Sequence, residues 1–141
     1  MKKQILTVAA ALAFTALASA PSHAQQVTQA KIPFAFNVEN TKMPAGEYQI
    51  QRALPSSKAV QQIRRTDSSA SMFVLTSPTD ARGYGSELIF HCYGDECFLS
   101  EIRTGNRQGL KLPVSRGEKE ASRAIGGNEL AVVSLPLTVR P

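Results

Sequence analysis

Three residues that could do chemistry lie close together near the middle of the 141-residue chain: His91, Cys92 and Cys97. Gly94 and Asp95 separate two runs of apolar and aromatic residues, a pattern that predicts a tight hairpin turn. The hairpin places Cys92 opposite Cys97 in a non-hydrogen-bonded pair, the closer kind of cross-strand pair, which suits a disulfide. We therefore predict a structural Cys92–Cys97 bond.

A redox-active pair or a metal site fits these cysteines less well. Thioredoxin-like sites use Cys-x-x-Cys, whereas four residues separate Cys92 from Cys97. A zinc site needs more ligands than two cysteines and one nearby histidine. We expect no metal ion and no other cofactor.

His91 is the only histidine after residue 24, so a hydrolytic triad would have to use it. Ser86, Ser100, Glu87 and Asp95 are near it in sequence, but strand alternation scatters them. The chain has no Gly-x-Ser-x-Gly motif and no P-loop. We predict that the protein is not an enzyme and has no catalytic residue, with a small periplasmic hydrolase that uses His91 as an alternative.

The first 24 residues carry the three regions of a secretory signal peptide. Lys2 and Lys3 give a positive start, residues 5–20 are almost entirely apolar, and small residues precede the predicted cleavage between Ala24 and Gln25. We expect a periplasmic or secreted protein, in a compartment where a disulfide persists. Residues 25–141 then form a single domain.

The charge pattern limits the possible partners. The chain has 16 Lys and Arg against 11 Asp and Glu, a formal net charge of +5. The basic residues are dispersed, whereas nucleic-acid binders concentrate them on one face or interleave them with stacking aromatics. After the signal peptide, no apolar run reaches the roughly 20 residues of a membrane helix. We expect an envelope or extracellular partner, no nucleic acid and no membrane span in the mature chain; the oligomeric state stays open.

Short strand-like segments alternate with turn residues along the mature chain. This spacing predicts a mainly β domain, an antiparallel β-sandwich or small barrel of about seven strands with one short C-terminal helix. Ser115 and Glu118 form a Ser-x-x-Glu capping box for that helix. The predicted strands cover 31–38, 47–52, 59–65, 71–76, 87–93, 96–103 and 129–139, and the helix covers 115–125.

The predicted hairpin is apolar on both faces, which favours a central position in the sheet. Simple alternation pairs Ser100 with Ile89 and places Ile102 on the same face as His91. The residues expected on one face are Leu88, Phe90, Cys92, Cys97 and Leu99, and those expected on the other are Ile89, His91, Tyr93, Phe98 and Ile102.

Four short segments occur in a characteristic order: Ile32-Pro33-Phe34-Ala35-Phe36, Met43-Pro44-Ala45-Gly46-Glu47-Tyr48, Tyr93-Gly94-Asp95 and Leu112-Pro113-Val114-Ser115. This order resembles a family of small exported bacterial proteins that have no assigned activity. The resemblance implies a secreted β-rich domain and transfers no substrate, cofactor or site residue.

Function is therefore expected on the loops of a rigid β scaffold. The sequence favours a non-enzymatic binding or structural module that uses loops 77–85 and 104–113. A β-barrel carrier of a small apolar ligand is an alternative, and it predicts inward-facing residues that fail to fill the interior.

Overall fold

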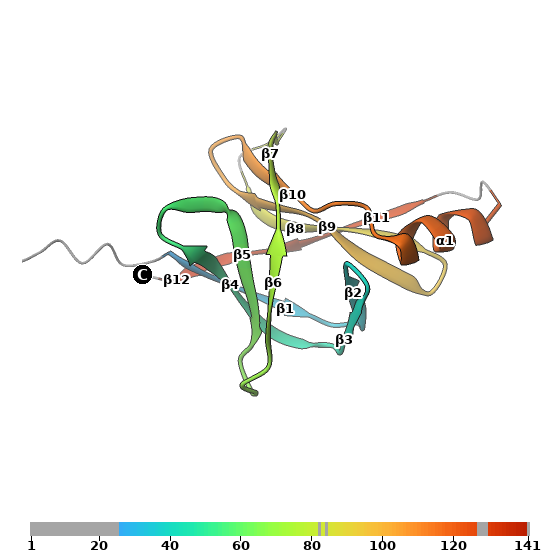
Figure 1. The fold of residues 1–141 in the computed structure, drawn as a ribbon, viewed down its shortest axis with the longest axis horizontal. Helices are drawn as coiled ribbons and strands as arrows, with labels where there is room; N and C mark the ends of the chain where they lie inside the picture. The colour runs from blue at the N-terminus through green and yellow to red at the C-terminus, as the bar shows by residue number, and fades with distance from the viewer. Residues whose placement is uncertain (1–25, 82, 84, 127–129, 141) are drawn as a thin grey trace, which may run out of the picture.

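The computed structural model describes residues 26–81, 83, 85–126 and 130–140. The predicted signal peptide, with its cleavage site at Ala24 and Gln25, lies outside these residues. The described chain is mainly β, with twelve strands in two facing sheets and one short helix near the C-terminus (Figure 1). The predicted fold class is confirmed.

The first sheet contains five antiparallel strands. Their spatial order is β12 (Thr138–Arg140), β1 (Val27–Ile32), β4 (Gly46–Leu54), β5 (Ser57–Arg65) and β6 (Ser71–Leu75). β1 therefore lies between β12 and β4, and it joins the two ends of the described chain.

The second sheet curls around one side of the core as a half-barrel. Its main path is β11 (Ala131–Pro136), β8 (Ser86–Tyr93), β9 (Glu96–Thr104), β10 (Gln108–Lys111) and β7 (Ser77–Asp80). β2 (Phe36–Val38) pairs with β3 (Thr41–Met43), and it also makes one parallel bridge to β9.

Two long strands pass from one sheet into the other. β6 continues into β7 after Thr76, and β11 continues into β12 after Leu137. A strand that bends in this way belongs to one sheet at its start and to the other at its end. The two crossings join the sheets along both sides of the core.

The described residues contain more strands than the seven predicted from the sequence. Residues 33–35 divide the predicted first strand into β1 and β2, and Leu137 divides the predicted last strand into β11 and β12. β3, β7 and β10 form where turns or loops were expected. β7 and β10 pair with each other across a long stretch of chain, and hydrophobic alternation does not reveal such pairing. β3 pairs with the adjacent β2 in a short hairpin.

The core lies between the sheets and is centred on three aromatic rings. Phe36 packs edge-to-face against Tyr48 and Phe90, with ring centroids 5.2 and 5.4 Å apart. The Tyr48 hydroxyl donates a 2.6 Å hydrogen bond to the Pro44 carbonyl, and burial raises the pKa of this hydroxyl. The buried polar end of Tyr48 is thus satisfied.

A β-bulge at Ser100 changes the predicted faces of the hairpin. Phe90 pairs with Leu99, but Ile89 pairs with Glu101, so Ser100 is the extra residue. The predicted Ser100–Ile89 pair is therefore wrong. Beyond the bulge Ile102 pairs with Leu88 and is buried in the core cluster, away from the His91 face.

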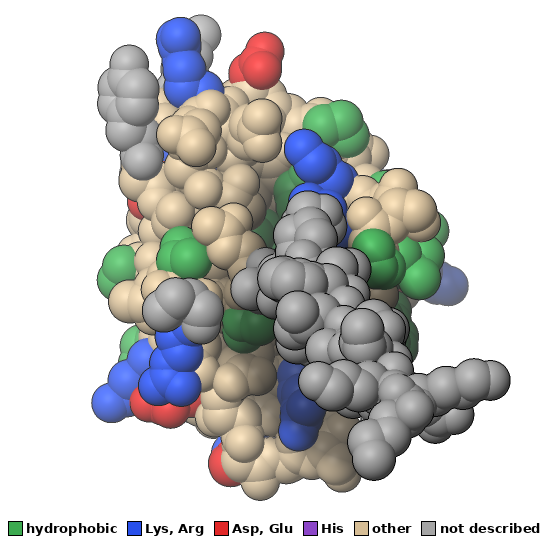
Figure 2. Space-filling model, turned by 90° about the vertical axis from the view of Figure 1, so that its left-hand side faces the viewer, with side chains coloured by type: hydrophobic (Ala, Val, Ile, Leu, Met, Phe, Trp, Pro, Cys, Tyr) green, Lys and Arg blue, Asp and Glu red, His purple; other side chains and the backbone are tan. Residues whose placement is uncertain are grey.

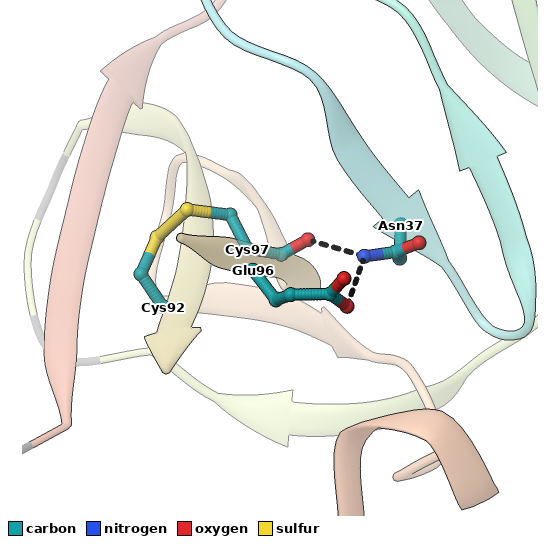
Figure 3. The surroundings of a disulfide bond; sticks show 4 residues. All are labelled: Asn37, Cys92, Glu96 and Cys97. Atoms are coloured by element: carbon teal, nitrogen blue, oxygen red, sulfur yellow. Dashed lines mark hydrogen bonds between the residues drawn. A yellow bond between two sulfur atoms is a disulfide. The ribbon is translucent and has the colours of Figure 1, made fainter. Parts of the chain in front are cut away.

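The predicted disulfide joins Cys92 to Cys97 across the β8–β9 hairpin, with Cα atoms 4.0 Å apart (Figure 3). Asn37 of β2 donates hydrogen bonds to the Cys97 carbonyl and to the Glu96 carboxylate, at 3.3 and 3.4 Å. β2 is thereby attached to the end of β9 that also carries the disulfide.

Helix α1 (Arg116–Ala124) lies near the turn end of this hairpin (Figure 1). Ser115 is its N-cap and accepts a 3.1 Å hydrogen bond from the Glu118 backbone. Ile125 is the C-cap of the helix, and Gly126 follows in the left-handed conformation with φ 59°. Glu118 is its only buried residue among those the structure describes.

Candidate functional site

A large cleft opens where β5 and β7 diverge. β6 stays paired with β5 up to Thr76, whose backbone N–H donates a 2.7 Å hydrogen bond to the Ala59 carbonyl. The chain then leaves β5, and β7 pairs with β10 of the other sheet. The resulting cleft has a volume of about 1480 Å³ and is lined by residues of both sheets. Small-molecule sites commonly occupy about 300–1,000 Å³, so the cleft is large enough for such a ligand.

The inward-facing residues change character along each strand toward this cleft. On β1 the order is Ile32, Ala30, Thr28, and on β4 it is Tyr48, Ile50, Arg52. On β5 Ile63 is followed by Gln61, and on β9 Ile102 is followed by Thr104. Thr28, Arg52, Gln61 and Thr104 all line the cleft. Within each of these strands the packed core therefore gives way to a cleft in which polar groups lie beside apolar ones such as Ile50 and Ile102.

Gln61 is the most buried amide of the cleft, with 6% of its surface exposed. Its Nε2 donates a 2.8 Å hydrogen bond to the Lys58 carbonyl. Thr28, also buried, donates through Oγ1 to the Ile50 carbonyl at 2.9 Å. The hydrogen bonds of the described residues leave Gln61 Oε1 free to accept another donor, as a binding group would require.

The charged residues of the cleft are mainly basic. Arg52, Lys58 and Arg107 line it together with one acidic residue, Asp80. Figure 2 views the end of the molecule where the β4–β5 connection projects; separate Lys and Arg side chains stand on a largely uncharged surface. The balance of charge at the cleft favours an anionic group on a ligand.

The two loops expected to carry function lie side by side in one wall of this cleft. Parts of 77–85 and 104–113 become β7 and β10, which pair Asp80 with Gln108 and Thr79 with Gly109. The prediction of loops was wrong over these residues. Three consecutive positive φ angles at 105–107 make a tight turn that leads from β9 directly into β10. A side chain at Gly109 would place its Cβ 2.9 Å from Thr79 Cγ2, which explains the glycine.

His91 belongs to a separate cluster on the outer face of β8. Glu118 of α1, 4% exposed, accepts a 3.1 Å hydrogen bond from the Tyr93 hydroxyl, and His91 Nδ1 lies 3.4 Å from the same carboxylate oxygen. Burial, together with this carboxylate, raises the pKa of Tyr93. Glu118 thus attaches the first turn of the helix to the hairpin.

This cluster supplies an acid beside His91 but no attacking group. A hydrolytic triad needs a hydroxyl or thiol within hydrogen-bonding reach of the histidine. No serine contacts His91 among the hydrogen bonds of the described chain. Glu87, one of the acids expected nearby, binds Arg103 and Ser134 instead.

The sequence placed Glu118 in the first turn of the helix but did not indicate the partner of its carboxylate. In a complete capping box its carboxylate would accept from the Ser115 backbone. Its backbone N–H does bind Ser115, but its carboxylate binds Tyr93. A glutamate at this position of a helix predicts a cap equally well, so no sequence signal distinguishes the two contacts.

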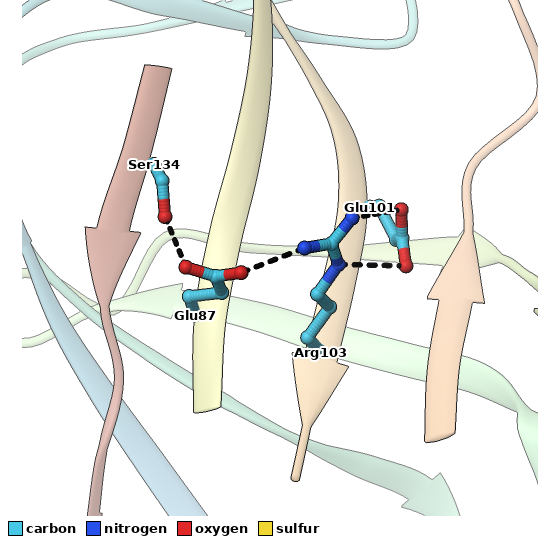
Figure 4. A network of polar contacts seen from close by, with 4 residues as sticks. All are labelled: Glu87, Glu101, Arg103 and Ser134. Atoms are coloured by element: carbon cyan, nitrogen blue, oxygen red, sulfur yellow. Dashed lines mark hydrogen bonds and ion pairs between the residues drawn. The ribbon is translucent and has the colours of Figure 1, made fainter. Parts of the chain in front are cut away.

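The outer face of the half-barrel carries a second polar network (Figure 4). Arg103 of β9 contacts Glu87 of β8 at 2.7 Å and Glu101 at 3.1 Å, and Ser134 of β11 donates to the other oxygen of Glu87. The hydrogen bond from Ser134, followed by Arg103, lowers the pKa of Glu87. The hydrogen bond to Glu101, together with Glu87, raises the pKa of Arg103. The network connects β11, β8 and β9, and its groups satisfy one another.

The described residues contain no group of three or more His, Cys, Asp and Glu side chains placed to hold a metal ion. Their single helix is also too short and too polar to cross a membrane. Comparison of the chain with models of protein families, with curated proteins and with solved structures gives no match in any of the three. The resemblance to a family of exported bacterial proteins therefore stays a prediction, and the site rests on its own geometry.

Proposed function

We propose that this protein is a non-enzymatic exported binding module, and that the cleft between β5 and β7 holds a polar ligand. The observation that carries the proposal is the set of polar side chains, Thr28, Arg52, Gln61 and Thr104, that line the cleft beside apolar residues. Thr28 and Gln61 already donate hydrogen bonds within the protein, and Gln61 Oε1 can still accept one from a ligand.

The chemistry of the lining favours a ligand with hydroxyl or amide groups and an acidic group. Gln61 and Gln108 can both donate and accept hydrogen bonds, and the arginines can bind a carboxylate or phosphate. An apolar cargo would cover these groups without replacing their hydrogen bonds. The alternative of an apolar carrier therefore receives less support than a polar binding site.

Export is part of the proposal and rests on the sequence of the first 24 residues. The Cys92–Cys97 bond is consistent with it, because disulfides persist in oxidising compartments. On the same grounds we propose that the protein works in the periplasm or outside the cell.

Mass spectrometry on protein exported by its own signal tests both parts of the proposal. Under denaturing conditions, the mass should correspond to cleavage after Ala24 and to the loss of two hydrogens at the cysteines. Under native conditions, we expect a small acidic molecule to remain bound. Retention of the signal peptide would contradict export but would not bear on the proposed binding site in the cleft.

Titration with glucuronate, citrate and inorganic phosphate, followed by NMR, tests the cleft directly. We expect Arg52→Gln and Gln61→Leu to weaken binding, each by about tenfold, which corresponds to one lost charge-assisted or buried hydrogen bond. Arg64→Gln is the matched control, because Arg64 is exposed and lies on the outer face of β5. Equal binding by the two cleft variants and the control would contradict the proposed site.

A further inference from the structure

The free edge of β6 presents backbone groups that have no partner in the described chain. β6 pairs with β5 alone, and Thr76 N–H donates to the Ala59 carbonyl while Arg65 N–H donates to the Ala70 carbonyl. Hydrogen-bonded pairs alternate in an antiparallel ladder, so Met72 and Val74 also direct their backbone groups toward β5. The N–H and C=O groups of Ser71, Phe73 and Leu75 therefore point to the open edge.

The same residues expose apolar side chains. Phe73 is 61% exposed and Leu75 is 65% exposed, side by side on the outer face of the sheet. Proteins usually protect an edge strand with lysine, proline or a bulge. The sequence Ser71-Met72-Phe73-Val74-Leu75 has no charge, proline or glycine. The unpaired backbone groups and the exposed apolar side chains of β6 can therefore both contact another strand.

An apolar groove of about 430 Å³ continues this edge. It lies between the β6–β7 bend and the segment that follows β10, and Leu75, Leu112, Pro113 and Val114 line it. Val114 is itself half exposed. A strand added beside β6 would extend over this groove and could place an apolar side chain there.

We propose that the free edge of β6 binds an extended segment of a partner protein, which adds a strand to the first sheet. Backbone hydrogen bonds to Phe73 and Leu75 provide affinity, and alternate apolar side chains of the segment pack on these two residues. Arg64, on the neighbouring strand β5 opposite Ser71, places a positive charge near one end of the segment and Lys111 places one at the groove, so acidic residues suit both ends. This surface is separate from the cleft and does not depend on the proposed ligand.

A second copy of the chain fits the edge less well than a different partner does. β6 leaves the sheet at Thr76, so two copies could pair only over 71–75, with the symmetry axis at Phe73. That register sets Ser71 of one copy opposite Leu75 of the other. The polar run Thr66-Asp67-Ser68-Ser69-Ala70 would then approach the apolar groove. A partner segment in which apolar and polar residues alternate matches this surface better.

A labelled synthetic peptide tests the proposal by fluorescence anisotropy with the full chain. The peptide alternates valine and threonine and carries glutamate at each end. Valines opposite Phe73 and Leu75 share the outer face and direct their N–H groups to β6, so N-methylation of the valines should abolish binding. N-methylation of the threonines, the matched control, should leave binding within about twofold, because those N–H groups point away.

Variants locate the binding on β6. Phe73→Thr with Leu75→Thr should weaken peptide binding by about tenfold or more, because threonine keeps strand propensity but removes most of the apolar contact. Gln51→Thr on the outer face of β4 is the control, and thermal unfolding checks that each variant is folded. Equal binding of both methylated peptides, or no saturable binding of the unmodified one, overturns the proposal. A dimer that dissociates in the double variant would also overturn it and assign the edge to a second copy.

Discussion

The two ends of the space between the sheets share several strands but are filled differently. At one end Phe36, Tyr48 and Phe90 fill the space between the sheets, and the disulfide closes the adjacent hairpin. At the other end Gln61 and Thr28 face an open cleft. The difference teaches that a packed core and the proposed binding site can occupy opposite ends of one strand.

The packed end should respond most strongly to mutation. Phe36→Ala removes a ring that is 1% exposed and contacts two other aromatics, so we expect a loss of about 3–5 kcal/mol in the free energy of unfolding. Chemical denaturation measures this loss. Phe73→Ala is the control, since loss of this exposed ring should lower the free energy of unfolding by less than about 1 kcal/mol. Similar losses in the two variants would show that the packed end is not the main source of stability.

The disulfide should contribute the next largest effect. Replacing Cys92 and Cys97 with alanine frees a short loop, and the chain-entropy gain of such a loop is about 2 kcal/mol. Urea unfolding of the double variant, compared with the wild type with and without reductant, measures this contribution. A variant as stable as the oxidised wild type would mean that the bond serves another purpose at this end.

A smaller, pH-dependent effect is expected on the outer face near the cleft. The folded-state pKa of Glu87 is lowered by Ser134 and Arg103, so its stabilisation is present above the unfolded pKa and is lost as pH falls through the folded pKa. Glu87→Gln should cost about 0.5–1 kcal/mol at neutral pH, as is typical of a partly exposed ion pair.

Unfolding at neutral and acid pH tests the sign of this effect. The difference in the free energy of unfolding between the wild type and Glu87→Gln should shrink below about pH 4, where the carboxylate begins to protonate. A difference that grows at low pH would contradict the assigned direction. Glu120→Gln, on the exposed face of α1, is the control for a general loss of negative charge.

The smallest effect on stability is expected inside the cleft. Gln61 is nearly as buried as Phe36, yet Gln61→Leu should change the free energy of unfolding by only about 0.5 kcal/mol in either direction, since leucine adds apolar burial while an amide hydrogen bond is lost. Chemical denaturation beside Phe36→Ala tests the contrast directly. A loss above about 2 kcal/mol would mean that the cleft end is packed as tightly as the other end.

Local patterns predicted the elements whose signals lie within a few residues. Gly94-Asp95 between two apolar runs predicted the hairpin and the pairing of the cysteines, and Ser115 predicted the start of the helix. The alternation of apolar residues likewise located β4, β5, β6, β8 and β9 close to their observed bounds. Each of these features depends on neighbouring residues alone.

The features that the sequence did not predict depend on distant partners. The bulge at Ser100 shifts Ile102 to the core face, and the carbonyl of Ser100 accepts a hydrogen bond from Leu112 N–H of the segment after β10. β7 and β10 pair with each other, so neither has a recognisable strand pattern alone. The cleft arises from this pairing, because it separates β7 from β5.

The position of β1 has a consequence for the order in which the molecule can assemble. Gln29 of β1 pairs with Thr138 of β12, and a hydrogen bond joins these two residues across 109 positions of the chain. Contacts between such distant segments form late and slow folding, because a long loop must close first. The first sheet therefore cannot be completed until the last strand is available. A chain with this topology cannot complete its first sheet while it passes through a translocation channel, which suits the exported protein we propose.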